Sequence, residues 1–188
     1  MPRPDRSRSA LIETAGTLFR RQGYAATGLN QILEEAGVKA GSLYHHFPGG
    51  KQELAAAVVE SAGGDIEKLL RRALAADVPV ETVVGRWVDL LAGGLAADCR
   101  DGCPVEPIAT ESVHASELVR RASARAFNGW CAAIADRLRA DGWDAEQAAD
   151  QALAVVSIIE GALVLSRTTG DVRALRAARA AAQSLLRR

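Results

Sequence analysis

The segment from Gly37 to Lys51 constrains this chain more than any other part of its sequence. Glycines bound a stretch, residues 40–46, that carries a serine, a tyrosine and two histidines. Glycine is common just past a helix end, and these polar side chains are able to bind a partner. We therefore predict a short helix over 40–46 whose surface contacts another molecule, with Lys51 at the start of the next helix.

Two helices are expected before this segment. Between residues 6 and 22, apolar residues recur at the period of an amphipathic helix, and Gly23 follows as a stop. These apolar residues are Leu11, Ala15, Leu18 and Phe19. A second helix follows, with the Thr27 side-chain oxygen capping its start and Gly37 at its end. Two helices joined by a tight glycine-containing turn form a helix-turn-helix, whose second helix lies in the major groove of DNA.

The polar residues around this turn suit a nucleic acid. A backbone phosphate can be held by a hydroxyl, a cation, an imidazole or the free amides of a helix start. Groups of this kind near the expected helix starts are Thr27, Ser42 and Lys51. Gly41 would let the short helix approach a base edge closely, beside Tyr44 and His45. Leu43 and Phe47 are expected to point the other way, into the core.

Charge agrees with this interpretation only locally. Residues 1–51 carry seven cations and four acids, a net charge of +3, and the remainder carries −3 because the chain has 23 of each sign. Phosphate attraction is needed only at a contact surface. Arg3, Arg6 and Arg8 are expected to form either an arm that touches DNA or a merely solvated tail. Likewise, the two histidines could be solvated helix-end residues, and Tyr44 could simply cover the core.

Residues 6–60 resemble the DNA-binding domain of the TetR family of transcriptional regulators. The order and spacing of many residues carry this resemblance, which is far more specific than a general helix-turn-helix pattern. These residues are Ala15, Leu18, Phe19, Gly23, Tyr24, Thr27, Ile32, Ala36, Gly37, Val38, Gly41, Ser42, Leu43, Tyr44, His46, Phe47, Lys51 and Leu54. Shorter matches over 47–51, 102–105 and 110–111 are similar to the subgroup typified by LmrA and YxaF.

The resemblance implies a set of contacts to double-stranded DNA. Phosphate contacts are implied for Thr27, Ser42, Tyr44, His46 and Lys51, and base contacts for Ala40, Gly41 and His45. Family members often place Ser or Thr just before the recognition helix, whereas this chain has Lys39 and then Ala40. A capping hydroxyl is therefore missing there, and a cation has moved one position upstream, so we include Lys39 among the DNA-binding residues.

Beyond residue 50 the sequence has helical periodicity and nothing that reads as a strand pattern. We predict an all-α fold, with an N-terminal three-helix helix-turn-helix DNA-binding domain over 1–50 and a C-terminal helical ligand-binding and dimerisation domain over 51–188. Expected helices in the second part are 51–74, interrupted or weakened at Gly63 and Gly64, then 80–97, one that stops at Gly142, 145–167, and a last one through residues 175–185. No membrane span is expected in 145–167, because Glu160 and Gly161 interrupt an apolar run that is too short.

Small residues, mainly alanine, are frequent on the last two expected helices. We expect these helices to pair with the same helices of a second copy in a four-helix interface, as the family resemblance also implies. Packing within one subunit is the alternative. Two DNA-binding domains related by a two-fold axis would read the two half-sites of a palindromic operator.

A cavity in the second part could bind a small, largely apolar effector. Its expected lining is Trp87, Cys103, Val105, Phe127 and Trp130, with His114 and Glu160 as orienting polar groups. An effector that binds better to a form whose two DNA-binding domains do not match the half-site spacing would release the protein from DNA. On this interpretation the protein is a ligand-responsive repressor. Activation is the same-class alternative, and aromatics at helical spacing are also typical of an ordinary core.

Two other readings stay open. The cysteines are Cys99, Cys103 and Cys131, an odd number in a chain without a secretory leader. Free thiols in a reducing cytoplasm are therefore expected. Redox or metal sensing is the alternative. Glu111 and His114 have the Glu-x-x-His spacing of helical metal-dependent enzymes, but such a site needs the element twice. No phosphate-cradling loop or nucleophile elbow is present either, so neither catalysis nor a cofactor is expected.

Overall fold

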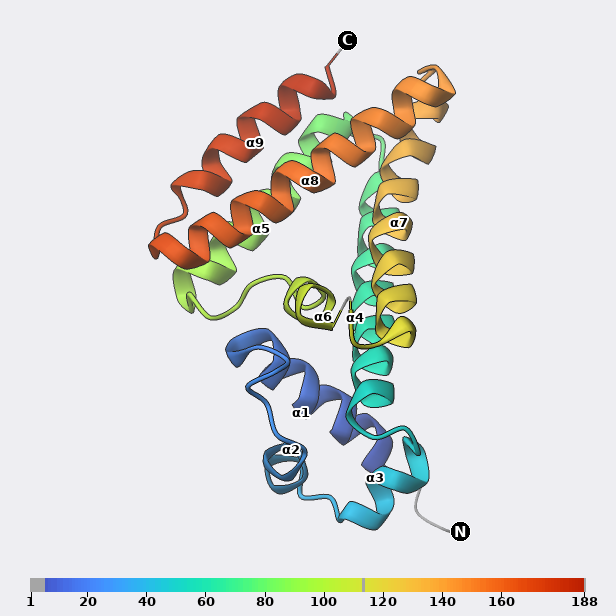
Figure 1. Cartoon of the computed structure of the whole chain (residues 1–188). Coiled ribbons are helices and arrows are strands. Elements are labelled where there is room, and N and C mark those ends of the chain that lie inside the picture. The colour runs from blue at the N-terminus through green and yellow to red at the C-terminus, as the bar shows by residue number, and fades with distance from the viewer. Residues whose placement is uncertain (1–5, 113, 188) are drawn as a thin grey trace. The chain divides into compact units, whose positions relative to one another are not determined.

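The structure is a computed structural model that describes residues 6–112 and 114–187. Within these residues it contains nine α-helices and no strand (Figure 1). The helices are α1 (Ser7–Gln22), α2 (Leu29–Ala36), α3 (Ala40–His46), α4 (Lys51–Leu74), α5 (Val80–Ala97), α6 (Glu106–Ser112), α7 (Glu117–Ala140), α8 (Ala145–Thr169) and α9 (Arg173–Leu185). The predicted all-α fold is confirmed.

The chain divides into two compact units, which we call the N-terminal and C-terminal units. The N-terminal unit comprises 1–63 and 104–126, and the C-terminal unit comprises 64–103 and 127–188. This division differs from the expected boundary at residue 50, because the first part of α4 and the whole of α6 belong with α1, α2 and α3.

The N-terminal unit is built around the buried face of α1. All four apolar residues that predicted this helix are buried. Ile32 of α2, Leu43 of α3 and Leu54 of α4 are also completely buried. Burying such a side chain contributes about 1.5–3 kcal/mol to folding, so these residues fix α2 and α3 against α1. We call α1, α2 and α3 the head.

Helix α4 passes without interruption through Gly63 and Gly64, so of the predicted alternatives, an interrupted or a weakened helix, the interruption is wrong. Gly63 is buried, and a Cβ built on it would lie 2.5 Å from the Cβ of Ala126 in α7. A glycine at this position therefore permits a close helix–helix approach within the N-terminal unit, although it lowers the intrinsic helix propensity.

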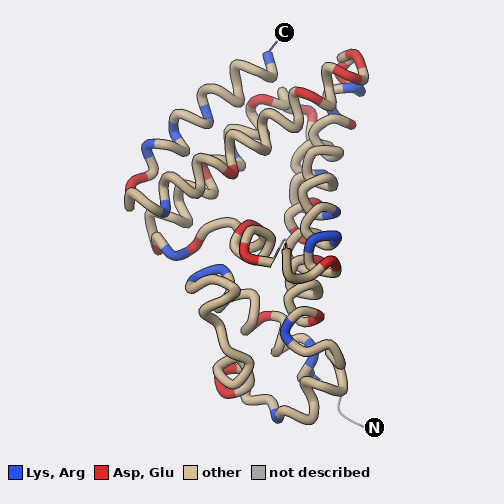
Figure 2. The backbone as a smooth tube through the Cα atoms, in the orientation of Figure 1, with Lys and Arg blue, Asp and Glu red and all other residues tan. Residues whose placement is uncertain are grey.

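In the C-terminal unit, α5, α8 and α9 pack against one another (Figure 1). The Asp144 side chain caps α8 by accepting hydrogen bonds from the amides of Glu146 and Gln147, which lowers the pKa of Asp144. Gly170 ends α8 in the left-handed region, at φ +68°. Arginines recur along α9 (Figure 2), whose buried side carries Leu175, Ala178 and Ala182.

Helix α8 is buried on only part of its surface. Leu153 and Leu165 are 58% and 59% exposed, and Val164 is also exposed. By length and composition alone α8 could cross a membrane, with 39% of its most apolar window buried, so the expectation that the run is too short is wrong. A core helix of a globular protein meets the same criterion.

Candidate nucleic-acid interface

Helix α3 presents a row of exposed residues on one side of the head. Lys39, Ala40, Gly41, Tyr44 and His45 are all exposed, and Tyr44 has 54% of its surface accessible. A Cβ added to Gly41 would meet nothing within 4 Å. The backbone of α3 is therefore open at Gly41, as direct approach to a base edge requires.

The opposite side of α3 is anchored in the core. Leu43 and Phe47 are 0% and 1% exposed, as the sequence predicted. The Arg8 guanidinium lies 5.5 Å from the centre of the Phe47 ring, a cation–π distance. Arg6 and Arg8 are exposed, whereas Arg3 lies outside the described residues. The anchored side holds the exposed row in a fixed orientation.

The side chains of Ser42 and His46 are hydrogen-bonded within the head. Ser42 Oγ donates to Ser7 Oγ at 2.8 Å, and Ser7 Oγ lies 2.9 Å from His46 Nε2. Phosphate oxygens only accept hydrogen bonds, so the Ser42 hydroxyl is not available to phosphate while it donates to Ser7. No sequence pattern indicated the role of Ser7, which ties α3 to α1.

Thr27 does not cap α2, so the predicted cap is wrong. Helix α2 begins at Leu29, with Gly28 in the capping position. Thr27 is completely buried, and its hydroxyl donates to the Gly23 carbonyl at 2.7 Å and accepts from Gln22 Nε2. Because this hydroxyl is buried and both of its partners lie inside the head, we do not place Thr27 among the exposed residues of the interface.

Lys51 is the first residue of α4 and is half-buried. Its Nζ lies 4.2 Å from the centre of the Tyr24 ring. Desolvation lowers the pKa of Lys51, and the carboxylate of Glu111 partly offsets this by favouring the charged form. Helix α3 contains no Lys, Arg, Asp or Glu (Figure 2), and Lys39 directly precedes it in the sequence.

The residues predicted to line an effector cavity fall into both units. Val105 and His114 belong to the N-terminal unit. Members in the C-terminal unit are Trp87, Cys103, Phe127, Trp130 and Glu160. Trp130 is buried and packs edge to face on Phe127, with ring centroids 5.1 Å apart. Trp130 therefore belongs to the core, and neither ring lines the two cavities described next.

An apolar cavity of about 360 Å³ lies between α4 and α5 in the C-terminal unit. It is lined by Ile66, Leu69, Leu70, Ala73, Ala76, Val83, Arg86, Trp87, Leu90 and Leu91. Trp87 belongs to the predicted set, and the leucines of α4 were missed because they read as an ordinary amphipathic face. Its volume lies in the range of small-molecule sites.

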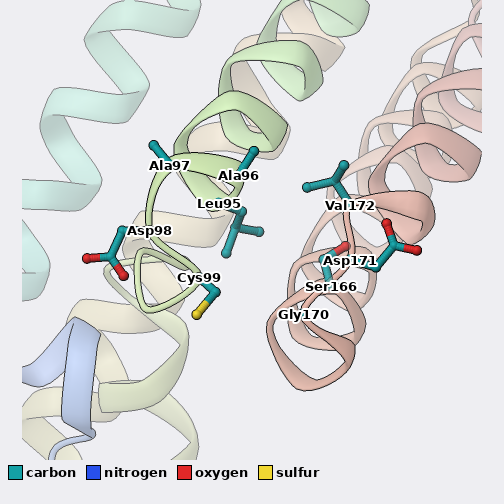
Figure 3. Close-up of a pocket in the computed structure, with 9 residues that line it drawn as sticks. All are labelled: Leu95, Ala96, Ala97, Asp98, Cys99, Ser166, Gly170, Asp171 and Val172. Atoms are coloured by element: carbon teal, nitrogen blue, oxygen red, sulfur yellow. The ribbon is translucent and has the colours of Figure 1, made fainter.

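A second cavity, of about 510 Å³, lies between the end of α5 and the turn from α8 to α9 (Figure 3). Leu95 to Cys99 form one side, and Ser166 with Gly170 to Val172 forms the other. Cys99 is exposed, Cys103 is buried and Cys131 is half-buried. Burial raises the pKa of Cys131, which disfavours its thiolate form.

No cluster of three or more His, Cys, Asp or Glu suited to a metal ion occurs in the described part of the chain. In particular, Glu111 and His114 do not converge with other ligands. His114 is exposed beyond the end of α6, and a Glu111 oxygen accepts a hydrogen bond from the Ala25 amide.

An anchored, exposed α3 that follows α2 after a tight glycine turn defines a helix-turn-helix DNA-binding regulator. Comparison with known proteins specifies the class further. Residues 11–58 match the family model for bacterial regulatory proteins of the tetR family. Residues 79–181 match the model for the C-terminal domain of LmrA/YxaF-like transcriptional regulators.

Curated relatives agree with both matches. The chain is 37% identical to the uncharacterized regulator YxaF of Bacillus subtilis over 166 residues, covering 88% of this chain and 87% of YxaF. It is 34% identical to the regulator LmrA of the same organism over 163 residues, covering 86% and 87%. A TetR regulator from Legionella pneumophila shares the fold, with a TM-score of 0.87 over the full length of both chains at 20% identity.

The chain therefore belongs to the TetR family of transcriptional regulators, in its LmrA/YxaF-like group. It is a DNA-binding protein and not an enzyme.

Proposed function

We propose that the protein is a homodimeric repressor that binds a palindromic operator and is released from it by a small, largely apolar effector. The exposed row on α3 is the observation that carries this proposal. Lys39, Gly41, Tyr44 and His45 face outward while Leu43 and Phe47 hold the helix. Gly41 and His45 would lie at base edges, and Lys39, Tyr44 and Lys51 at phosphates. Acting on bacterial DNA implies a cytoplasmic protein.

Dimerisation is proposed through α8 and α9. The exposed residues of α8 include Leu153, Val164 and Leu165, which would cost less free energy if a second copy covered them. The exposed alanines of α9 would let a facing helix approach closely; they are Ala177, Ala180 and Ala181. An isologous pair of these faces gives a four-helix interface and two heads related by a two-fold axis.

The cavity between α4 and α5 is the proposed effector site. Its wall combines Trp87 with leucines, of which Leu69 and Leu90 are 53% and 63% exposed. Such a wall favours an apolar or aromatic compound, and Arg86 could orient a polar group on it. An effector that binds better to the DNA-incompetent form shifts the population toward that form. Substituting Leu90→Glu should abolish effector release while leaving operator affinity unchanged.

Footprinting on the DNA that flanks the gene tests the proposed function. We expect a protected region with two half-sites about one helical turn apart, or a multiple of it. Protection should weaken as salt is raised and should survive excess competitor DNA of random sequence. Loss of protection at the same competitor concentration for every sequence would contradict operator binding.

A further inference from the structure

A carboxylate of α6 contacts the turn that joins α1 to α2. Glu111 Oε2 accepts a hydrogen bond from the Ala25 N–H at 2.5 Å, within the N-terminal unit. A hydrogen bond to a charged acceptor is stronger than one between neutral groups. The contact joins positions 86 residues apart in the sequence, so it restrains the turn from a distant segment.

Glycine at position 23 makes this contact possible. A Cβ built on Gly23 would lie 2.7 Å from Glu111 Oε1. The φ of Gly23 is +93°, a conformation that side-chain-bearing residues rarely adopt. Gly23 therefore shapes the turn and leaves room for the carboxylate, whereas the sequence indicated only a helix stop.

Tyr24, which lies between Gly23 and Ala25, supports the side chain of Lys51. The Lys51 ammonium lies 4.2 Å from the centre of the Tyr24 ring, and this ring packs on Phe19 with centroids 5.3 Å apart. A cation over an aromatic face is attracted by the ring quadrupole. The turn held by Glu111 thus carries the platform on which the Lys51 side chain lies.

We propose that Glu111 is a positioning residue for DNA binding. By holding the turn at Ala25 it fixes the Tyr24 ring, and the ring holds Lys51 where its ammonium reaches a phosphate. The inference rests on the proposed function, because it assigns Lys51 to the DNA surface. Glu111 is anionic and would repel phosphate if it approached DNA directly, so we expect it to act through the turn and through its attraction for the Lys51 ammonium. DNA affinity thereby depends on the position of α6.

Fluorescence anisotropy on the footprinted duplex, with the full-length chain, tests this route. Glu111→Ala should weaken binding about tenfold, the low end of the range for a hydrogen bond to a charged group. Glu111→Gln keeps an oxygen acceptor for the Ala25 amide and should stay within about threefold of wild type. Glu60→Ala is the matched control, because Glu60 is also an exposed carboxylate of the N-terminal unit and bonds Arg125 instead. Equal affinities for Glu111→Ala and Glu60→Ala would overturn the proposal.

A double-mutant cycle separates positioning from general stabilisation. In a Lys51→Ala background, Glu111→Ala should cost less than about twofold, because the residue that it positions is already gone. Fully additive losses would overturn the route through Lys51. Should Glu111→Ala fail to fold, Tyr24→Leu tests the ring between the turn at Ala25 and Lys51. This variant should lower operator affinity only while Lys51 is present. Unchanged binding would overturn the proposal. A wild-type chain that binds no duplex specifically would overturn the proposed function as well, whereas failure of the variants alone would not.

Discussion

The Ser42 hydroxyl in α3 donates a hydrogen bond to Ser7 Oγ, the first residue of α1, at 2.8 Å. Ser7 Oγ also lies 2.9 Å from His46 Nε2. A single small side chain therefore joins both ends of the recognition helix to the start of α1. This linkage lies beside the proposed DNA surface but is internal to the head.

Replacing Ser7 by alanine should destabilise the head. The change removes the shared partner of two half-buried polar groups, and a net hydrogen bond is worth about 0.5–1.5 kcal/mol. We expect the free energy of unfolding to fall by about 1 kcal/mol in urea denaturation. Ser61→Ala, at an exposed position of α4, is the control. Equal stabilities of the two variants would show that the linkage contributes nothing.

Replacing Gly41 by alanine should affect stability and DNA binding in opposite directions. The added methyl enters open space on a helix, so the free energy of unfolding should rise by up to about 1 kcal/mol. The same methyl would obstruct a base edge, so operator affinity should fall or sequence preference should change. Gly64→Ala is the control, because Gly64 also faces open space in a helix. An unchanged operator affinity and preference in Gly41→Ala would place this residue outside the DNA contact.

Replacing Lys51 by alanine should weaken binding to all duplexes by a similar factor. A phosphate contact carries no sequence information, and its loss should reduce the slope of log affinity against log salt by about 1. Titrations at several salt concentrations measure this slope. Lys68→Ala removes an exposed lysine from the same helix and should leave the slope unchanged. A wild-type slope in Lys51→Ala would remove Lys51 from the phosphate contacts.

Replacing Leu153 by arginine should separate the dimer. Leu153 is 58% exposed on the α8 face proposed as the interface, and an unpaired buried charge there would be strongly unfavourable. Sedimentation velocity should show a monomer. The operator affinity of this variant should be reduced. Leu118→Arg introduces the same charge at another exposed leucine, in α7, and should remain dimeric. A dimeric Leu153→Arg would place the interface elsewhere.

Much of the fold could be predicted because local signals and tertiary packing agree. The expected bounds of α3, α4 and α5 are those of the structure, since glycine or proline sets them off and apolar residues fill one face. Gly63 shows the limit: a glycine that breaks a helix and one that admits Ala126 look alike in a sequence. Short α6, which starts with an acid and a proline, gave no periodic signal and was missed.

The site was less predictable because side-chain partners are not local. The exposure of Gly41, Tyr44 and His45 could be predicted from their place in a short polar helix. The burial of Thr27 depends on where α2 begins, and the linkage of Ser42 to Ser7 spans 35 positions. Trp130 shows that an aromatic pattern cannot separate core from cavity, because both need large apolar side chains at helical spacing.

Sedimentation of the full-length chain with the footprinted duplex, beside a duplex of the same composition in scrambled order, tests the central claim most directly. We expect two copies of the chain on each operator duplex and none on the scrambled duplex under the same salt conditions. A monomer that binds both duplexes equally, or neither, would contradict the account.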